Sequence, residues 1–324
     1  MNLGIVILNW NGEELLKQFL PSLIDFTPIK HNIYIIDNGS NDNSIGFVEN
    51  NYKRIKVIKL DTNYGYAKGY NIGLKNINDE ILCLLNNDVE VTENWTENIL
   101  KQFELEPKTA IIQPKLKNYY EKSEFDYAGA AGGYLDKYGY PYCDGRNYKK
   151  IEKDLGQYDK IKDIFWACGA CFFVRKKIFD NHNGFDEIFW AHMEEIDLCW
   201  RIQNSGYKIR YNNTTEVFHA NASTLNQNNP RKTFLNYRNK LFMITKNSQN
   251  NLFFLLIEKI FIDALISIFI LFSKGFNHFF AIIKAYFSFY KHLNLLLEFR
   301  KNEKREIKHY KIRSIICEYL FYKR

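Results

Sequence analysis

Leu3-Gly-Ile-Val-Ile-Leu-Asn-Trp-Asn11 opens the chain and decides its fold. Its apolar run, residues 3–8, predicts a buried strand that ends in polar residues. The same pattern returns at residues 32–36, 55–60 and 81–85, and the segments between these runs (13–23, 44–50 and 67–75) have helical patterns. Such alternation predicts βαβ units around a mostly parallel sheet, an α/β fold.

Polar residues follow all four expected strands. They are Asn9-Trp-Asn-Gly12, Asp37-Asn-Gly-Ser40, Asn63-Tyr-Gly65 and Asn86-Asn-Asp88. Ligands of open parallel sheets bind at the carboxyl ends of the strands. We therefore expect these four clusters to meet at one edge and to form a ligand site.

The nature of that ligand is narrowed by two missing motifs. No Gly-x-Gly-x-x-Gly sequence follows the first strand, and no phosphate loop of the Gly-x-x-x-x-Gly-Lys-Ser/Thr type occurs, which argues against a dehydrogenase or an ATPase. A nucleotide site built on Asp37 remains, because a carboxylate in such a loop can accept the imide or hydroxyl hydrogens of a pyrimidine nucleoside. The alternative is that Asp37 belongs to an ordinary turn.

Residues 63–73 place three glycines, Lys68 and Asn71 at an expected junction of loop and helix. Backbone N–H groups at a helix start favour phosphate, so Lys68 is a candidate for contact with a pyrophosphate. A lysine on a solvated helix face is the alternative.

Asp88 follows the apolar strand 81–85 and is a candidate ligand for Mn²⁺ or Mg²⁺. These ions prefer oxygen ligands and usually take one or two carboxylates together with substrate phosphates. Asn86 and Asn87 offer only neutral oxygens.

Glu194, Glu195 and Asp197 lie within Ala191-His-Met-Glu-Glu-Ile-Asp-Leu-Cys-Trp-Arg201. Three carboxylates this close repel one another, so the stretch is the first candidate for chemistry. The apolar residues that follow predict a helix ending at Ser205-Gly206. The alternative interpretation is that the two glutamates only cap this helix.

Charge, cysteine content and the N-terminal segment indicate the compartment of the protein. The 324 residues carry a formal charge of +7, and residues 301–324 hold eight Lys or Arg against three Glu. Of the six cysteines only Cys168 and Cys171 form a close pair, so the sequence does not predict a zinc site. We expect all six to be reduced thiols in a cytosolic protein. The first apolar run is too short for a signal peptide, which favours a cytosolic catalytic part.

Seven motifs in this order resemble the inverting family 2 glycosyltransferases, and most closely their bacterial rhamnosyltransferase-like branch. The resemblance covers roughly residues 1–245. The motifs are Ile5-Val-Ile-Leu-Asn-Trp-Asn-Gly12, Ile36-Asp-Asn-Gly-Ser40, Asn63-x-Gly65 with Asn71-x-Gly73, Leu85-Asn-Asn-Asp-Val89, Gly169-Ala-Cys171, Gly184-Phe-Asp-Glu187 and Met193-Glu-Glu-Ile-Asp-Leu198.

The resemblance implies a GT-A fold and a nucleotide-diphosphate sugar donor, here a UDP- or dTDP-sugar. It implies that Asp37 holds the nucleoside, with Asn9, Asn11, Asn63, Lys68, Asn71 and Asn87 around the donor. It also implies that Asp88 and His219 bind the metal, although the first acid of the family's Asp-x-Asp motif is Asn86 in this chain.

The family's Glu-Asp pair is Glu194-Glu195 here, and its second position usually supplies the general base. Glu195 is therefore the expected base, Glu194 the second candidate, and Asp197 a support that fixes the helix start. An inverting reaction needs one such carboxylate to take the proton of the acceptor hydroxyl.

The expected product is a surface polysaccharide, made by transfer of rhamnose, galactofuranose or a similar hexose to a saccharide or lipid-linked saccharide. The rival from another class is a nucleotide-sugar-binding protein without catalysis. Nucleic-acid binding is not expected, because one basic end without an interleaved aromatic platform gives little support for it.

We expect two domains, a catalytic domain at residues 1–245 and a helical, basic extension at 246–324. Residues 252–272 are long enough to span a bilayer, but Glu258, Lys259 and Asp263 lie inside them, and each central charge costs about 2.5–3.5 kcal/mol. Amphipathic helices at 252–272, 276–290 and 293–299 are thus expected to lie on the inner face of the cytoplasmic membrane. The alternative is packing on the catalytic domain or on a second copy of the chain.

Overall fold

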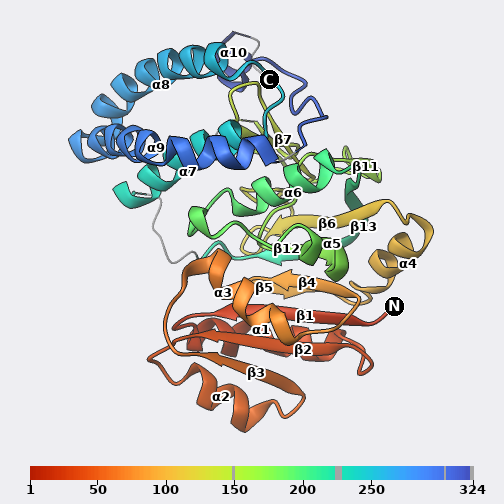
Figure 1. The fold of residues 1–324 in the computed structure, drawn as a ribbon. Coiled ribbons are helices and arrows are strands. Elements are labelled where there is room, and N and C mark those ends of the chain that lie inside the picture. Colours follow the sequence, from red (N-terminus) through yellow and green to blue (C-terminus); the bar gives the residue numbers. More distant parts are fainter. Residues whose placement is uncertain (148–149, 223–227, 303, 322–324) are drawn as a thin grey trace.

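The computed structural model describes residues 1–147, 150–222, 228–302 and 304–321. Its N-terminal half is a parallel sheet in the order β3 (Ile55–Leu60), β2 (Asn32–Asn38), β1 (Leu3–Asn9) and β4 (Ile81–Leu85). All four strands were predicted by their apolar runs. In Figure 1 this half lies at one end of the molecule, drawn in red and orange, and the C-terminal helices lie at the other.

The sheet continues beyond β4 with strands of mixed direction. β12 (Cys171–Arg175) runs antiparallel to β4, and β6 (Thr109–Asn118) runs antiparallel to β12. β13 (Lys208–His219) is parallel to β6, and it also pairs with β11 (Lys162–Asp163) and β5 (Val89–Val91). The resulting sheet is mixed but mostly parallel, as expected.

Helices connect these strands. They are α1 (Glu13–Phe26), α2 (Ser44–Asn51), α3 (Gly65–Gly73), α4 (Glu97–Leu105), α5 (Lys176–Asn181) and α6 (Glu194–Asn204). α1 illustrates why they form: Leu16, Phe19, Leu20 and Leu23 recur at helical spacing and are buried. α3 ends two residues before its predicted limit, and a short 3₁₀ turn, η1 (Leu74–Asn76), follows it.

Residues 119–147 and 150–161 form small excursions from the sheet. β7 (Gly133–Leu135) pairs with β8 (Pro141–Cys143), and β9 (Arg146–Asn147) pairs with β10 (Lys150–Ile151). The sequence of this segment has no clean period, and its strands were not predicted.

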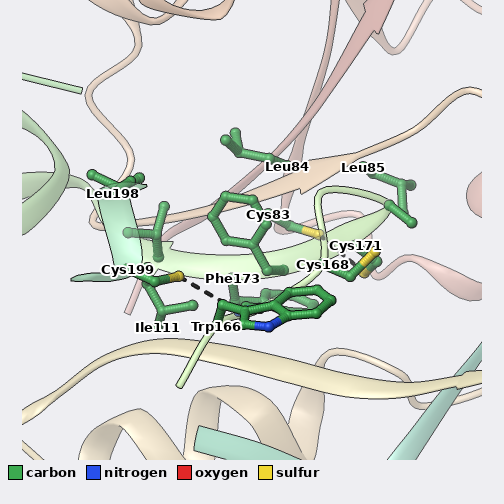
Figure 2. Close-up of a cluster of buried hydrophobic side chains, with 14 of the residues drawn as sticks. Cys83, Leu84, Leu85, Ile111, Trp166, Cys168, Cys171, Phe173, Leu198 and Cys199 are labelled. Carbon is green, nitrogen blue, oxygen red and sulfur yellow. Dashed lines mark hydrogen bonds between the residues drawn. The ribbon is translucent and has the colours of Figure 1, made fainter. Parts of the chain in front are cut away.

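Cysteine, aromatic and aliphatic side chains pack together in the core around β4 and β12 (Figure 2). All six cysteines are free, and five of them are buried. Cys83 on β4 and Cys171 on β12 face each other, with their Sγ atoms 4.0 Å apart. In this place they act as small apolar residues that let the two strands pack closely.

The C-terminal helices are α7 (Pro230–Asn247), α8 (Leu252–Lys274), α9 (Phe276–Asn302) and α10 (Ile315–Phe321). The sequence predicted two helices within residues 276–299, and this was wrong, because one continuous helix spans both. Lys291 and His292 lie between the two predicted helices, and neither is a Gly or Pro that would break a helix. The turn between α7 and α8 lies near the expected domain boundary at residue 245.

A buried polar cluster ties these helices to the rest of the chain. Asp263 on α8 accepts hydrogen bonds from Tyr286 Oη on α9, at 2.6 Å, and from Tyr140 next to β8. Lys259, one turn away, lies 3.3 Å from Asp263 and is fully buried. Since an unpaired buried charge is costly, the cluster fixes how α8 faces the protein.

Candidate active site

The carboxyl ends of β1, β2 and β4 meet at one edge, as the sequence predicted. Asn9 lies opposite Asp37 in the sheet register. Its amide donates to Ser44 Oγ at 3.0 Å and accepts from Asn87 Nδ2 at 3.0 Å. The side chain of Asn9 therefore joins three strand ends, and Asn87 is held beside it.

Asp37 is buried at this edge, and its carboxylate accepts the N–H of Ser40 at 3.1 Å. Asn11 closes the same loop, because its N–H donates to Ser40 Oγ at 3.0 Å and its Oδ1 accepts the N–H of Asn41 at 2.7 Å. Gly12 must lack a side chain here, since an added Cβ would lie 2.4 Å from both Asn9 Oδ1 and Asn87 Nδ2.

Asn63 is organised by Asn38, a residue that the sequence did not single out. Asn38 Nδ2 donates to Asn63 Oδ1, and Asn38 Oδ1 accepts the N–H of Tyr64, at 3.1 and 3.0 Å. Asn63 Oδ1 also accepts the N–H of Gly65 at 2.9 Å, which fixes the start of α3. Lys68 on the first turns of α3 is exposed, and its Nζ lies 4.9 Å from the ring centre of Tyr64.

Asn71 differs in its surroundings from the other expected donor-binding residues. Its amide donates to the carbonyl of Phe185 at 2.7 Å and accepts the N–H of Phe185 at 3.0 Å. Asn71 thus links α3 to the segment before α6. Because its amide nitrogen and oxygen are both bonded to the backbone of Phe185, we leave it out of the donor site that we propose below.

Asp88 and His219 are brought together by the pairing of β5 with β13, which sets His219 opposite Val89. His219 Nε2 lies 3.3 Å from Asp88 Oδ1, and the N–H of Ala222 donates to Asp88 Oδ2 at 2.8 Å. Burial raises the pKa of Asp88, but the hydrogen bond and the charge of His219 lower it more, so the net pKa lies below the usual range.

Asp126 completes this group, and sequence reasoning missed it. It is fully buried and lies 2.9 Å from His219 Nδ1. Burial lowers the pKa of His219, whereas the charge of Asp126 and the hydrogen bonds to Asp126 and Asp88 raise it to about 10. A carboxylate that accepts the Nδ1–H of a histidine, and so leaves Nε2 for a metal, is the usual arrangement behind a metal-binding histidine.

The chemistry of this group fits a divalent cation in part. Asp88 and His219 offer one carboxylate oxygen and one ring nitrogen, which Mn²⁺ accepts. Nowhere in residues 1–147, 150–222, 228–302 and 304–321 do three or more His, Cys, Asp or Glu side chains group so as to hold a metal ion. Two protein ligands leave the remaining positions to a bound diphosphate, which is how such ions are commonly held.

Glu194 and Glu195 form the second half of the site, on the first turn of α6. Burial and the charge of Glu195 raise the pKa of Glu194 well above its usual value. Burial raises the pKa of Glu195 to about 7, against the opposite effect of backbone N–H groups at the helix start. One Oε2 atom of each glutamate is buried and finds no partner among the described residues, and no side chain caps α6.

The Cys168 thiol, just before β12, lies within electrostatic reach of both Asp126 and Glu195. Besides burial, the charges of Asp126 and Glu195 both raise the pKa of the Cys168 thiol, so this thiol lies near both acids. The N–H of Asn86 donates to the carbonyl of Ala170 at 2.9 Å. Tyr66 Oη donates to the carbonyl of Gly169 at 3.1 Å, and its pKa is raised by burial and by Tyr70 and the two glutamates.

The backbone just before Glu194 is strained. Trp190, His192 and Met193 have φ values of 63°, 69° and 75°, in the left-handed region that non-glycine residues avoid. Asn239 on α7 holds this segment, because its amide donates to the carbonyls of Phe189, Ala191 and His192 at 2.7–3.0 Å. Backbone strain of this kind persists only where the surroundings fix it.

We expect the substitution Asn239→Ala to lower the free energy of unfolding by about 1–3 kcal/mol, because three buried carbonyls lose their donor. It should also lower the catalytic rate by releasing the turn that positions Glu194. Urea unfolding and steady-state kinetics test this. Asn236→Ala, on a half-exposed position of the same helix, is the control. Equal stability of the two variants would contradict the role of Asn239.

Two cations of α7, Arg231 and Arg238, contact the same turn. Arg238 donates to the carbonyls of Ile188 and Phe189 at 3.2 and 3.0 Å, and the Arg231 guanidinium lies 4.5 Å from the ring centre of Trp190.

Asp197 is fully buried between Arg201, at 2.7 Å, and Lys246, at 3.0 Å. These contacts tie Asp197 to the rest of α6 and to α7, and its role as a support of the helix start stays a prediction.

Comparison with known proteins identifies the family of this chain. Residues 4–182 match the family described as Glycosyl transferase family 2. The chain is 22% identical over 235 residues to an N-acetylglucosaminyl-diphospho-decaprenol L-rhamnosyltransferase of Mycobacterium tuberculosis, covering 68% of this chain and 76% of the relative. It is 24% identical over 223 residues to the rhamnosyltransferase WbbL of Escherichia coli, covering 67% and 81%.

Solved structures show the fold. The crystal structure of GalNAc-T7 with UDP, GalNAc and Mn²⁺ superposes with a TM-score of 0.61 at 18% identity, over 77% of this chain and 48% of that one. The mannosyltransferase PcManGT from Pyrobaculum calidifontis, in complex with GDP-Man and Mn²⁺, gives 0.53 at 11% identity, over 90% and 75%. This likeness confirms the expected GT-A fold.

Proposed function

Because the chain belongs to Glycosyl transferase family 2, and resembles its rhamnosyltransferase-like members, we propose that it transfers a hexose with inversion of the anomeric carbon. The donor is a pyrimidine nucleoside diphosphate sugar, and the acceptor is a hydroxyl group of a saccharide. The observation that carries this proposal is the glutamate pair at the start of α6, the buried Glu194 and the partly exposed Glu195, whose Oε2 atoms find no partner among the described residues.

The donor fits the edge formed by β1, β2 and β4. Asp37 accepts hydrogens of the base or ribose, and the amides of Asn9, Asn11, Asn63 and Asn87 shape the loops around it. The exposed Lys68 faces the diphosphate from the first turns of α3, where the N–H groups of a helix start add favourable dipoles. GalNAc-T7, which shares the fold, was solved with UDP and Mn²⁺.

In the transfer step, the acceptor oxygen forms a bond with the anomeric carbon while its proton passes to Glu195. The bond between that carbon and the diphosphate oxygen breaks, and the nucleoside diphosphate leaves with the electron pair. Asp88 and His219 would hold a divalent cation, which would supply charge stabilisation for this leaving group when bound. Glu195 suits its role because a base with a pKa of about 7 is deprotonated near neutral pH and still accepts a proton.

Donor binding is tested by thermal shift with UDP, dTDP and GDP, each with Mn²⁺, Mg²⁺ or EDTA. We expect a pyrimidine diphosphate with metal to stabilise the protein by about 2.7 kcal/mol at a hundred times its dissociation constant. GDP should have little effect, and EDTA should remove the shift.

Two variants decide where this ligand sits. Asp88→Asn should lose the metal-dependent part of the shift, because it removes a charged oxygen ligand. The exposed Asp25→Asn serves as control. A shift that persists in Asp88→Asn would place the cation elsewhere, and no shift with any nucleotide would contradict the proposed donor.

The acceptor is proposed from the relatives. One of them is named for transfer to N-acetylglucosaminyl-diphospho-decaprenol, which is a lipid-linked saccharide. We therefore propose a lipid-linked saccharide acceptor at the cytosolic face of a membrane, and a product used in surface polysaccharide synthesis. Transfer of radiolabelled rhamnose from its dTDP donor to lipid-extractable material is the direct assay.

A further inference from the structure

The polarity of α8 is inverted relative to a helix of a soluble protein. Its inward face carries Leu255, Lys259, Asp263 and Ser267, all buried at a spacing of four residues. Its outward face is apolar from residue 253 to residue 272, a length of about 30 Å. The side chains there that expose half or more of their surface are Phe253, Phe254, Ile257, Phe261, Leu265, Ile268, Phe269 and Phe272.

This outward face carries no charge within residues 253–272, because Lys259 and Asp263 point inward and Glu258 is paired with Lys137 and Tyr138. The charges that argued against burial of this segment in lipid are thus held by the protein itself. Soluble monomers rarely expose a continuous apolar patch of this extent, so the surface calls for a partner.

α9 adds a stripe that mixes aromatic and basic residues. Phe280, Lys284, Phe287 and Lys291 recur at spacings of three and four, so they share one face of the helix, and all four are exposed. An apolar groove of about 320 Å³ joins this stripe to α8, lined by Phe287 from α9 and by Ile260 and Ala264 from α8. Figure 1 shows the two helices side by side at one end of the molecule.

The charge of this surface distinguishes its two plausible occupants. The exposed charged residues of α8 and α9 are Lys274, Lys284, Lys291, Lys301 and a single acid, Glu298. In a two-fold dimer the patch would meet the same patch of the second copy. The lysines at 284 and 291 would then face the lysines of the other copy, and no acid on the stripe would offset their repulsion. An anionic bilayer surface complements both the apolar face and its lysines.

We propose that the outward face of α8, together with the Phe280–Lys291 stripe of α9, docks the protein on the surface of an anionic lipid bilayer. No helix among the described residues is long and apolar enough to cross a membrane, so the contact is made in one leaflet. The aromatic side chains enter the acyl layer, and the lysines reach the headgroups by extending their apolar stems.

Flotation of the full-length protein with vesicles tests the proposal. Vesicles of phosphatidylglycerol and phosphatidylethanolamine are compared with vesicles of phosphatidylcholine alone. The variant Phe261→Glu/Phe269→Glu should bind anionic vesicles at least about tenfold more weakly, since each side chain loses its apolar burial. The control Leu105→Glu/Leu155→Glu changes two equally exposed apolar residues outside α8 and α9 and should bind like the parent chain.

Two further readouts separate lipid from other occupants. Lys284→Glu/Lys291→Glu should lose the preference for anionic vesicles, and tryptophan at Phe269→Trp should be quenched by brominated lipid more than tryptophan at Leu105→Trp. Protein that stays below the vesicles, or a stable dimer that Phe261→Glu/Phe269→Glu dissociates, would overturn the proposal. Nucleotide-induced thermal shifts should be equal in all these variants, so a failed membrane test leaves the proposed donor site untouched.

Discussion

Substitution of Glu195 by glutamine is expected to lower the transfer rate by about 10²–10⁴-fold, because the variant cannot take the acceptor proton. Glutamine keeps the size and one carbonyl oxygen of the side chain, so donor binding should not change. Steady-state kinetics and the nucleotide thermal shift measure the two properties separately.

Glu194→Gln is the matched substitution, since both glutamates lie on the first turn of α6 and both have raised pKa values. We expect a smaller loss of rate from it. If Glu195→Gln keeps its activity while Glu194→Gln loses it, the base is Glu194. A parent chain that binds nucleotide but transfers no sugar would instead favour the binding protein without catalysis.

Glu195→Gln should also make the protein more stable above neutral pH. The pKa of Glu195 rises from about 4.5 in the unfolded chain to about 7 in the folded protein. The folded state therefore loses stability as the pH rises from 4.5 through 7, because the unfolded state releases its proton more easily. Glu195→Gln lacks this loss, so its melting temperature should exceed that of the parent chain at pH 8 and match it near pH 4.5.

Sequence reasoning located the donor edge because its signals are local. Each βα unit shows an apolar run followed at once by Asn, Asp or Gly, and parallel pairing brings such run ends together. Asp37 and Asp88 were singled out in this way, whereas Glu195 was singled out by its cluster of acids and by the resemblance to the family. Asp126 could not be, since it lies 93 residues from His219 in a segment without a period, and only the folded chain places them 2.9 Å apart.

The C-terminal helices show a different limit. The helical periodicity of residues 252–272 was visible, but periodicity does not tell which face turns inward. Lys259 and Asp263 argued against a membrane span, but the sequence did not show that Tyr140 and Tyr286 supply the hydrogen bonds that let Asp263 be buried. Partners so distant in sequence, and the hold of Asn239 on residues 189–192, are properties of tertiary packing.

Substitution of Asp197 by alanine is expected to lower the free energy of unfolding by about 3–5 kcal/mol, the usual cost of removing one partner of a buried ion pair. Asp197 accepts from Arg201 Nε at 2.7 Å, Lys246 Nζ at 3.0 Å and Asn247 Nδ2 at 2.7 Å. Although burial raises its pKa, the two cations lower it below the usual range, so this stabilisation is lost as the pH falls through that pKa. Urea unfolding at pH 7 measures the effect.

A double substitution shows whether the cost comes from the uncompensated charge of Lys246. This lysine is almost fully buried and also pairs with Asp186. Asp197→Leu/Lys246→Met replaces the pair by apolar residues and should be more stable than Asp197→Ala, although Arg201 still loses one partner. If the double variant is instead as unstable as the sum of the two single changes, the ions act independently, and Asp197 supports α6 through packing alone.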